Sequence, residues 1–369
     1  MKIAIILGTR PEIIKMSPII RYLNKKQENF FILHTGQHYS YEMDKTFFDT
    51  LELPAPKYNL DVGSASHAIQ SGKIMMGVEE VFQKEKPDVV LVQGDTNTVM
   101  AGAIAASKLH IKVGHVEAGL RSHDRSMPEE INRIIADHIS DYLFAPTKLA
   151  KDNLLDEGID QNKIFITGNT IVDAILQNLK IAQKSGNILK TLNLVHKNYF
   201  LVTVHRAENV DDKERLKKII MGLCAIQKKY SLPIIFPIHP RTNKRIAEFG
   251  IDLEGITIIP PQGFLEFLQL EDNAKLILTD SGGVQEEACI LGVPCVTLRD
   301  NTERPETVDV HANILSGVEP DLILRSTENM LESETIWKNP FGDGKASQMI
   351  IRTLIRAFQG SHSPDDSTA

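Results

Sequence analysis

The residues best suited to chemistry in this sequence directly follow apolar runs that read as strands. Gly8-Thr9-Arg10-Pro11-Glu12 comes after the first such run and leads into a helical pattern. A glycine turn before a helix offers free backbone N–H groups to an anion, and Arg10 and Lys15 add positive charge. Either cation alone could simply pair with a surface carboxylate. The strand, turn and helix taken together predict a phosphate site.

Three acidic residues of the first half lie at strand ends or at a helix start. Asp95 and Glu117 each follow a predicted strand, and Glu129 lies in the first turn of a predicted helix. Each has a structural alternative. Asp95 could cap a helix, Glu117 could pair with Arg121, and the helix dipole alone favours an acid at 129. If the three converge, they suit proton transfer, because neighbouring carboxylates take separate acid and base roles.

A second anion-binding group is predicted in the other half of the chain. Ser281-Gly282-Gly283 follows a predicted strand and opens a helix, so it offers a hydroxyl group and bare backbone donors. His205 follows another strand, and Arg304 lies in a loop. Glycine-rich turns are common in loops, so the turn alone says little. Together with His205 and Arg304, it predicts a second anion site.

These residues require a particular arrangement of elements. Short apolar runs alternate with amphipathic segments, which is typical of βαβ units on parallel sheets, where ligands bind at the carboxyl ends of the strands. We expect strands over residues 3–7, 30–34, 88–92, 112–116, 142–145, 163–166, 200–204, 233–238, 256–259, 275–278 and 295–298. We expect helices over residues 11–26, 65–84, 99–108, 128–138, 213–229 and 283–291.

The length of 369 residues exceeds one comfortable hydrophobic core and predicts two domains. We expect an α/β fold of two Rossmann-like domains whose parallel sheets face a cleft. The first covers residues 1–172, with a helix at 346–360 returning to it, and the second covers 173–345. A polar stretch at 182–197 lies near the boundary, and the polar tail 361–369 is expected to be disordered.

Composition narrows the possible partners and the location. With 42% hydrophobic and 24% charged residues and a net charge of −7, the chain is an ordinary globular protein whose main partner is neither nucleic acid nor an anionic membrane. Its three cysteines lie in apolar runs, which indicates buried thiols rather than disulfides or metal ligands. We find no signal peptide or membrane-spanning run, so we expect a cytoplasmic protein that does not enter the membrane.

Eight motifs, in one order along the chain, resemble those of non-hydrolysing UDP-N-acetylglucosamine 2-epimerases. They are GTRPE (8–12), QGDTNT (93–98), HVEAGLRS (115–122), PEEINR (128–133), VHRAEN (204–209), HPR (239–241), DSGGVQEEA (280–288) and TERPET (302–307). The resemblance implies a fold like that of B-type glycosyltransferases (GT-B), a homodimer, no cofactor and no metal. It also implies a role in polysaccharide biosynthesis.

The resemblance further implies a mechanism and a set of site residues. UDP leaves by anti-elimination to give a 2-acetamidoglucal, and syn re-addition gives UDP-N-acetylmannosamine. The leaving pyrophosphate must be held throughout, and the candidates for this clamp are Arg10, Lys15, His205, Ser281, Gly282, Gly283 and Arg304. By the same resemblance Gln262 and Phe267 flank the uracil and Glu287 holds the ribose. The catalytic set is Asp95, Glu117, Glu129 and His205, with Glu129 chosen over Glu130 by motif alignment.

Two segments depart from the family pattern. In many bacterial members, the segment that reads TGQHYSYEMD here (35–44) helps to form an allosteric site for a second substrate molecule, and only Gln37 is kept. The later stretch DVGSASHAIQ (61–70) lacks an arginine expected nearby. Both differences bear on allosteric activation, and they leave a related UDP-2-acetamido sugar open as the substrate.

Three other functions compete with this interpretation. A GT-B glycosyltransferase would share the fold, and Glu287 begins a matching E-A-x-x-x-G-x-P stretch, but position 279 holds threonine where such transferases carry a second glutamate. A hydrolysing epimerase would release free N-acetylmannosamine. A non-catalytic UDP-sugar sensor is disfavoured, because a pure anion binder gains nothing from three carboxylates beside the pyrophosphate.

Overall fold

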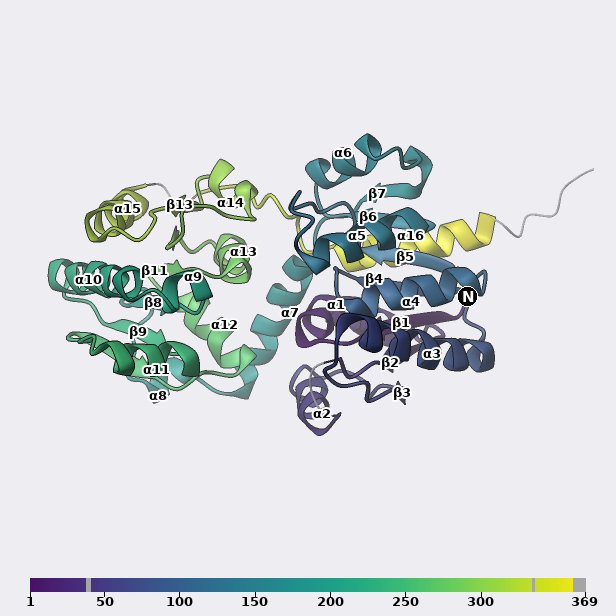
Figure 1. Cartoon of the computed structure of the whole chain (residues 1–369), viewed down its shortest axis with the longest axis horizontal. Helices are drawn as coiled ribbons and strands as arrows, with labels where there is room; N and C mark the ends of the chain where they lie inside the picture. The colour runs from purple at the N-terminus through teal and green to yellow at the C-terminus, as the bar shows by residue number, and fades with distance from the viewer. Residues whose placement is uncertain (38–40, 334–335, 361–369) are drawn as a thin grey trace, which may run out of the picture. The chain divides into compact units, whose positions relative to one another are not determined.

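The computed structural model describes residues 1–37, 41–333 and 336–360. It therefore omits the tail predicted to be disordered and part of the altered segment 35–44. The chain divides into two compact units, the first comprising Met1–Gln177 and Phe341–Ala369 and the second Asn178–Pro340. Each unit has one parallel sheet with helices on both faces (Figure 1). Among the described residues, no helix is long and apolar enough to cross a membrane.

The first unit is built on a seven-stranded sheet of order β3-β2-β1-β4-β5-β6-β7. Its strands are β1 (Ile3–Leu7), β2 (Phe30–His34), β3 (Tyr58–Asn59), β4 (Val89–Gln93), β5 (Lys112–Val116), β6 (Tyr142–Ala145) and β7 (Ile164–Ile166). Strand β1 pairs in parallel with both β2 and β4. The strand order reverses between β1 and β4, and ligands bind at such switch points in open parallel sheets.

Helices cover both faces of this sheet. They are α1 (Arg10–Lys26), α2 (Tyr41–Thr50), α3 (His67–Glu85), α4 (Asn97–Lys108), α5 (Pro128–Ile139), α6 (Lys148–Asp156), α7 (Thr170–Ser185) and α16 (Ala346–Gly360). Apolar residues of α3, α4 and α5 share a core with β1 and β4. Helix α4 packs very closely, since a Cβ on Gly102 would lie 2.6 Å from Cδ1 of Ile6. Helix α16 packs on α1, and Asp173 accepts hydrogen bonds from the backbone of Ala346 and Ser347.

The second unit repeats this plan with six strands in the order β10-β9-β8-β11-β12-β13. Its strands are β8 (Phe200–Thr203), β9 (Ile234–Pro237), β10 (Ile256–Ile259), β11 (Leu276–Thr279), β12 (Cys295–Thr297) and β13 (Asn313–Leu315). Its helices are α8 (Ile188–Thr191), α9 (Ala207–Val210), α10 (Lys213–Tyr230), α11 (Pro240–Phe249), α12 (Phe264–Asn273), α13 (Gly282–Leu291), α14 (Pro305–Asp309) and α15 (Pro320–Glu332).

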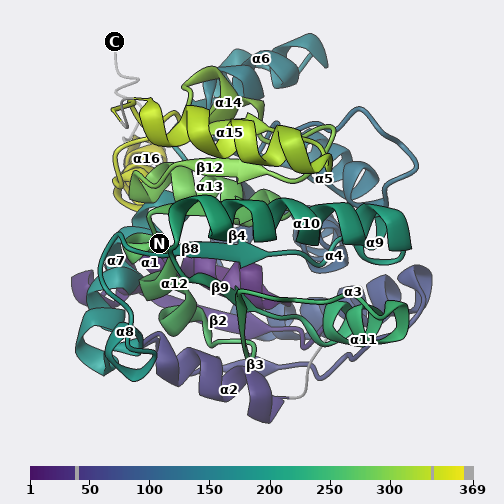
Figure 2. The same ribbon diagram turned by 90° about the vertical axis from the view of Figure 1, so that its left-hand side faces the viewer.

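Two separate cores lie on the two faces of the second sheet. One joins the strands to α10 and α15, which lie on the near side of the sheet in Figure 2. The other joins them to α8, α12 and α13. The switch point of this sheet lies between β8 and β11, so ligands are expected beside residues that directly follow these two strands.

The predicted fold class is confirmed, and every strand expected from the sequence is present within one or two residues. The short strands β3 and β13 were not predicted from the sequence, and neither were several helices, among them α11, α12 and α15. The polar stretch 182–197, expected as a boundary, contains the end of α7 and the short helix α8. The division between the units falls between Gln177 and Asn178, within α7.

Candidate active site

In the first unit, the loops after β1 and β4 meet at the switch point. A Cβ on Gly8 would lie 2.1 Å from the Thr98 hydroxyl oxygen and 2.5 Å from that of Thr35, so only glycine fits there. Glu12 is buried and accepts hydrogen bonds from the backbone N–H of Gly8 (2.5 Å) and Thr9 (3.1 Å). Its other oxygen accepts one from the hydroxyl of Thr96, in the loop after β4.

Glu12 was not assigned a role from the sequence, although Thr9-x-x-Glu12 is a capping-box pattern that could have identified it. Burial raises the pKa of Glu12 to about 7, even though its three hydrogen bonds lower it. Arg10 lies beside this turn with its guanidinium 5.6 Å from the ring centre of Phe47. The N–H groups of Gly8 and Thr9, which were predicted to be free for an anion, are therefore occupied by a buried glutamate that fixes the shape of the turn.

Lys15 and Glu117 form an ion pair with each other. The ammonium nitrogen of Lys15 lies 2.7 Å from both carboxylate oxygens of Glu117, and the amide of Gln93 donates to the same carboxylate. The alternative partner, Arg121, instead contacts Asp137 and Glu157. Glu117 has a positive φ of 69°, so its backbone adopts a left-handed conformation uncommon for this residue type. The backbone conformation of Glu117 and the donors Lys15 and Gln93 together fix its carboxylate just after β5, at the carboxyl end of the sheet.

Asp95 forms an ion pair with Arg133 of α5. The side chain of Asp95 is 34% exposed, so it stays accessible in this ion pair. It does not cap α4, because the N-cap residue is Thr96, whose hydroxyl accepts from the N–H of Val99. Arg133 also contacts the carboxylate of Glu130 at 2.9 Å. Arg133, which orients Asp95, was not identified from the sequence.

Glu129 and Glu130 have different surroundings. Glu130 is buried and accepts hydrogen bonds from the N–H groups of Ser122 and His123 at 3.0 Å each. Glu129 is exposed and lines a cavity of about 260 Å³ together with Asp95. The other lining residues are Gln37, Ser64, Ala65, His67, Gln70, Thr96, Asn97, Pro128 and Asn132. Glu117 is not among the described lining residues, so the structure brings Asp95 and Glu129 to one cavity and holds Glu117 with Lys15.

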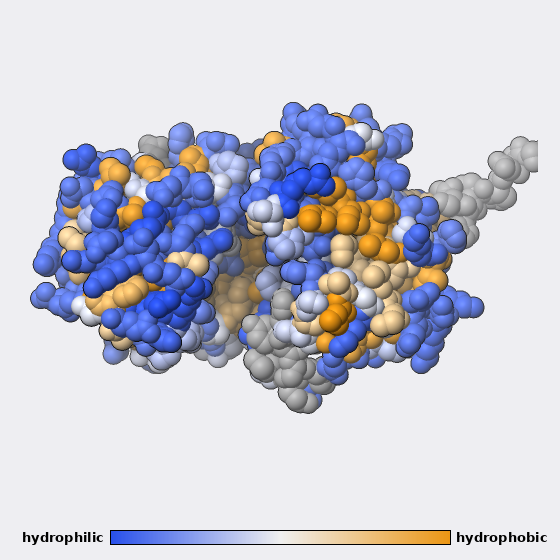
Figure 3. All heavy atoms as spheres, viewed as in Figure 1, coloured by the Kyte–Doolittle hydropathy of each residue, from blue (hydrophilic) through white to orange (hydrophobic). Residues whose placement is uncertain are grey.

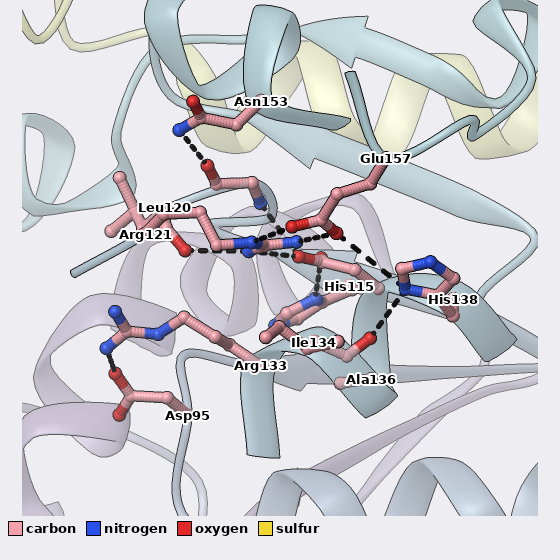
Figure 4. A network of polar contacts seen from close by, with 12 residues as sticks. Asp95, His115, Leu120, Arg121, Arg133, Ile134, Ala136, His138, Asn153 and Glu157 are labelled. Carbon is pink, nitrogen blue, oxygen red and sulfur yellow. Dashed lines mark hydrogen bonds and ion pairs between the residues drawn. The ribbon is translucent and has the colours of Figure 1, made fainter. Parts of the chain in front are cut away.

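A buried network of charges is centred on Asp137, which contacts His115 and Arg121. Figure 4 shows His115 and Arg121 in this network, with Glu157 beside Arg121. One oxygen of Asp137 lies 2.7 Å from Nδ1 of His115, and the other lies 2.8 Å from the guanidinium of Arg121. Nε2 of His115 lies 2.8 Å from the carbonyl oxygen of Gly94. Because both partners of the imidazole are acceptors, both of its nitrogens must carry protons. His115 is therefore a buried cation that holds the residue before Asp95.

The charges in this network keep each other ionised. Burial alone would lower the pKa of His115, but the neighbouring Asp137 carboxylate raises it above its usual value. Burial likewise works against ionised Asp137, yet His115 and Arg121 hold its pKa below the usual range. Arg121 also binds Glu157, at 2.6 and 2.7 Å, toward the surface. The network fixes the loops after β4 and β5, which carry Asp95 and Glu117.

In the second unit, the loops after β8 and β11 meet at the corresponding switch point. Asp280 is fully buried and accepts hydrogen bonds from the N–H groups of His205 (3.0 and 3.1 Å) and Arg206 (2.9 Å). Nδ1 of His205 lies 3.2 Å from the same carboxylate, and its ring is 42% exposed. These hydrogen bonds hold the pKa of Asp280 low in spite of its burial. Asp280 thus positions the predicted His205.

The turn Ser281-Gly282-Gly283 directly follows Asp280 and starts α13, with Ser281 as its N-cap. Gly283 is exposed, so backbone N–H groups at this helix start are open to an anion. Arg304 lies in a separate loop with its Nε 3.1 Å from Glu286 of α13. His205 and the turn therefore lie together at the switch point, and an ion pair connects Arg304 to the helix that begins there.

The residues predicted to contact the nucleoside lie on or next to α12 and α13. Gln262 precedes α12 and donates to the carbonyl of Pro260 at 2.6 Å. Phe267 is half-buried against the core beneath α12 and α13, which leaves part of its ring accessible. Glu287 is half-buried on α13 and contacts the carboxyl group of Glu271 on α12. Glu271 was not identified from the sequence.

Two Rossmann-type sheets, each with polar side chains and a helix start at its switch point, define a GT-B-like architecture. A family model described as UDP-N-acetylglucosamine 2-epimerase matches residues 21–355. The chain belongs to this family, whose members are epimerases and hence isomerases.

Relatives match over almost the whole chain. The UDP-N-acetylglucosamine 2-epimerase of Methanocaldococcus jannaschii is 62% identical over 96% of this chain and 99% of its own. Its structure in complex with UDP-GlcNAc and UDP superimposes with a TM-score of 0.83, covering 96% of this chain and 100% of that one. The UDP-2,3-diacetamido-2,3-dideoxy-D-glucuronate 2-epimerase of Pseudomonas aeruginosa is 43% identical, over 96% of this chain and 100% of its own.

Proposed function

We propose that this protein reversibly inverts C2 of UDP-N-acetylglucosamine to give UDP-N-acetylmannosamine. The observation that carries the proposal is the pair Asp95 and Glu129 lining one cavity at the switch point of a member of this family. The M. jannaschii relative was solved with UDP-GlcNAc and UDP, which supports this substrate. The P. aeruginosa relative acts on a diacetamido sugar acid, so a related UDP-2-acetamido sugar is the second candidate.

The chemistry explains why several acid–base groups and an anion clamp are required. The hydrogen on C2 has no adjacent carbonyl to acidify it, so C–O bond breaking leads and UDP leaves by anti-elimination. The 2-acetamidoglucal then takes a proton on the opposite face of C2, and UDP adds back in a syn sense. Inversion therefore needs acid–base groups for both faces. Asp95, Glu117 and Glu129 supply them.

The departing UDP must be neutralised and retained until it adds back. In the second unit, His205, the turn Ser281–Gly283 and Arg304 bind the pyrophosphate. In the first unit, Arg10 and Lys15 give the segment after β1 positive charge that suits an anionic ligand. The contacts of Asp280 with the backbone and ring of His205 support its role in binding the pyrophosphate. Gln262 and Phe267 flank the uracil, and Glu287 accepts hydrogen bonds from the ribose. No metal or cofactor takes part in this scheme.

Incubation with UDP-N-acetylglucosamine alone in D2O tests the proposal. Nuclear magnetic resonance of the sugar should show a mixture with UDP-N-acetylmannosamine and deuterium at C2 of both sugars, since each passage through the glucal exchanges this proton. Free N-acetylmannosamine would identify a hydrolysing enzyme instead. An unchanged substrate would rule out both, and the diacetamido sugar nucleotide would then be tried.

We also propose that the protein is a cytoplasmic homodimer whose product serves polysaccharide biosynthesis. Apolar residues gather over α4 and α5 on the visible face of the first unit (Figure 3). Nearby, Ile69 and Met76 of α3 and Ile131 of α5 are 56%, 60% and 43% exposed. A second copy of the chain would bury this face, which is larger than a scatter of single apolar residues.

Sedimentation should give twice the mass of one chain, and Met76→Glu should shift the protein toward the monomer because it places a charge in the buried face. Met221→Glu is the matched control, since Met221 is similarly exposed (52%) but lies on α10 of the second unit. A monomeric wild type, or a dimer that survives in Met76→Glu, would contradict this assignment of the face.

A further inference from the structure

The side chain of Glu271 on α12 is buried, and no described hydrogen-bond donor or basic side chain contacts its carboxyl group. Glu271 is 1% exposed, and neither of its carboxyl oxygens accepts a hydrogen bond from an N–H or O–H donor in the described part of the chain. Its hydrogen-bonding neighbour is the carboxyl group of Glu287 on α13. A buried acceptor without a donor is costly, so the contact between two acids requires an explanation.

No basic side chain among the described residues lowers the pKa of Glu271. The core beneath α12 and α13 is apolar, and its members Leu270 and Ala274 are fully buried. Besides Glu287, the titratable groups that act with Glu271 are the Tyr199 phenol, just before β8, and the Cys295 thiol of β12. Helix α8 turns Ile188 and Leu192 toward this core, and its Lys190 is exposed. Charge neutralisation by a base is therefore absent among the described residues.

Two carboxylates in contact cannot both be ionised in such an environment, because they would repel each other with little solvent screening. Burial and the adjacent charge of Glu287 raise the pKa of Glu271 well above its usual value. Glu287 is half-buried and reaches the surface of α13, so the negative charge is better solvated on Glu287. The proton between the two acids therefore belongs to Glu271.

We propose that Glu271 is a protonated carboxylic acid that donates a hydrogen bond to Glu287 and thereby fixes the Glu287 carboxylate to accept the ribose hydroxyls of a uridine nucleotide. This inference rests on the proposed ribose role of Glu287. Glu271 is a positioning residue and contacts no substrate. Its function is to set the orientation and the charge of Glu287, and through them the preference for ribose over deoxyribose.

The arrangement makes ribose recognition sensitive to alkaline pH. A glutamate whose pKa is raised by folding keeps its proton to a higher pH than a free glutamate does, and it loses that proton as the pH rises further. Once Glu271 is ionised, it repels Glu287 and the hydrogen bond between them is lost. The preference for UDP over 2′-deoxy-UDP should then fall.

Calorimetric titration with UDP and with 2′-deoxy-UDP tests this inference near neutral pH and in the alkaline range. The wild type should prefer UDP by roughly tenfold at neutral pH, the effect expected for a hydrogen bond to a charged acceptor, and by less at alkaline pH. Glu271→Gln keeps a donor that cannot ionise, so its preference should be the same at both pH values. Glu271→Leu removes the donor, so its preference should approach unity while 2′-deoxy-UDP still binds.

An infrared measurement gives a second readout that does not depend on binding. The carbonyl band of a protonated carboxylic acid should be present in the wild type at neutral pH and missing in Glu271→Gln. If this band is unaffected, or if Glu271→Leu retains the full preference for UDP, the inference is wrong. Failure of the proposed function looks different, because the wild type would then bind neither nucleotide, or Glu287→Gln would bind both with the wild-type preference.

Discussion

Asp95→Asn and Glu117→Gln are each expected to reduce kcat for C2 inversion by roughly 10²- to 10⁴-fold, the usual contribution of a positioned acid or base. Both variants should still bind UDP, because the residues proposed to hold the nucleotide belong mainly to the second unit. Either substitution preserves side-chain shape and removes the group that accepts the proton. Steady-state kinetics for kcat and calorimetry for UDP affinity would separate the two effects.

Asp141→Asn is a suitable control for this comparison. Asp141 pairs with Lys112 at the amino-terminal end of the sheet, away from the strand ends that carry the acids. Its replacement should leave kcat within about twofold, as is usual for a surface pair. Near-normal turnover in Asp95→Asn or Glu117→Gln would remove that residue from the catalytic set. Deuterium incorporation at C2 in either variant would show which of the two acids serves each face.

The buried carboxylate of Asp137 is expected to contribute strongly to the stability of the first unit. Asp137→Asn should lower the free energy of unfolding by about 3–5 kcal/mol, since it leaves the buried cations His115 and Arg121 without their shared counter-charge. Urea denaturation at neutral pH would measure this loss. The amide also presents a donor where only an acceptor fits, which adds to the cost.

Glu157→Gln is the matched control, because it removes the other carboxylate that binds Arg121. Glu157 is 29% exposed, so water can replace its contacts, and a loss of no more than about 1 kcal/mol is expected. Equal losses in the two variants would contradict the view that the inner pair carries the stability. In the wild type, the His115 contribution should be present at acidic to neutral pH and decline as the pH rises through its raised pKa.

The sequence predicted the parts of the fold that depend on local patterns. Strands such as β4 are buried on both faces, so they read as continuous apolar runs between turns. The short edge strand β3 has two half-buried residues, which is too little for a pattern. Helix α12 was missed because it is only ten residues long and lies just before β11, so its short apolar pattern is hard to distinguish from that of a buried strand.

The positions of Gly8, Asp95 and Ser281 just after strand ends could be predicted from the sequence. The partners of these residues were not predictable, because they come from distant segments. Lys15 was assigned to a phosphate, and the structure pairs it with Glu117, which lies 102 positions away. In the sequence, Glu271 cannot be distinguished from any other acid on a helix. Its contact with Glu287 depends on the packing of α12 against α13. Local patterns show which side chains can react, and only the tertiary structure shows what orients them.

The buried hydrogen bonds of Glu12 couple the motions of two loops in the first unit. One carboxylate joins the turn after β1 to Thr96 in the turn after β4, so neither loop can open without breaking hydrogen bonds to the other. The two segments should therefore form a single cooperative unit in hydrogen exchange. Any anion that orders the Gly8 turn also immobilises the turn carrying Asp95, which ties the arrival of the ligand to the alignment of the acid.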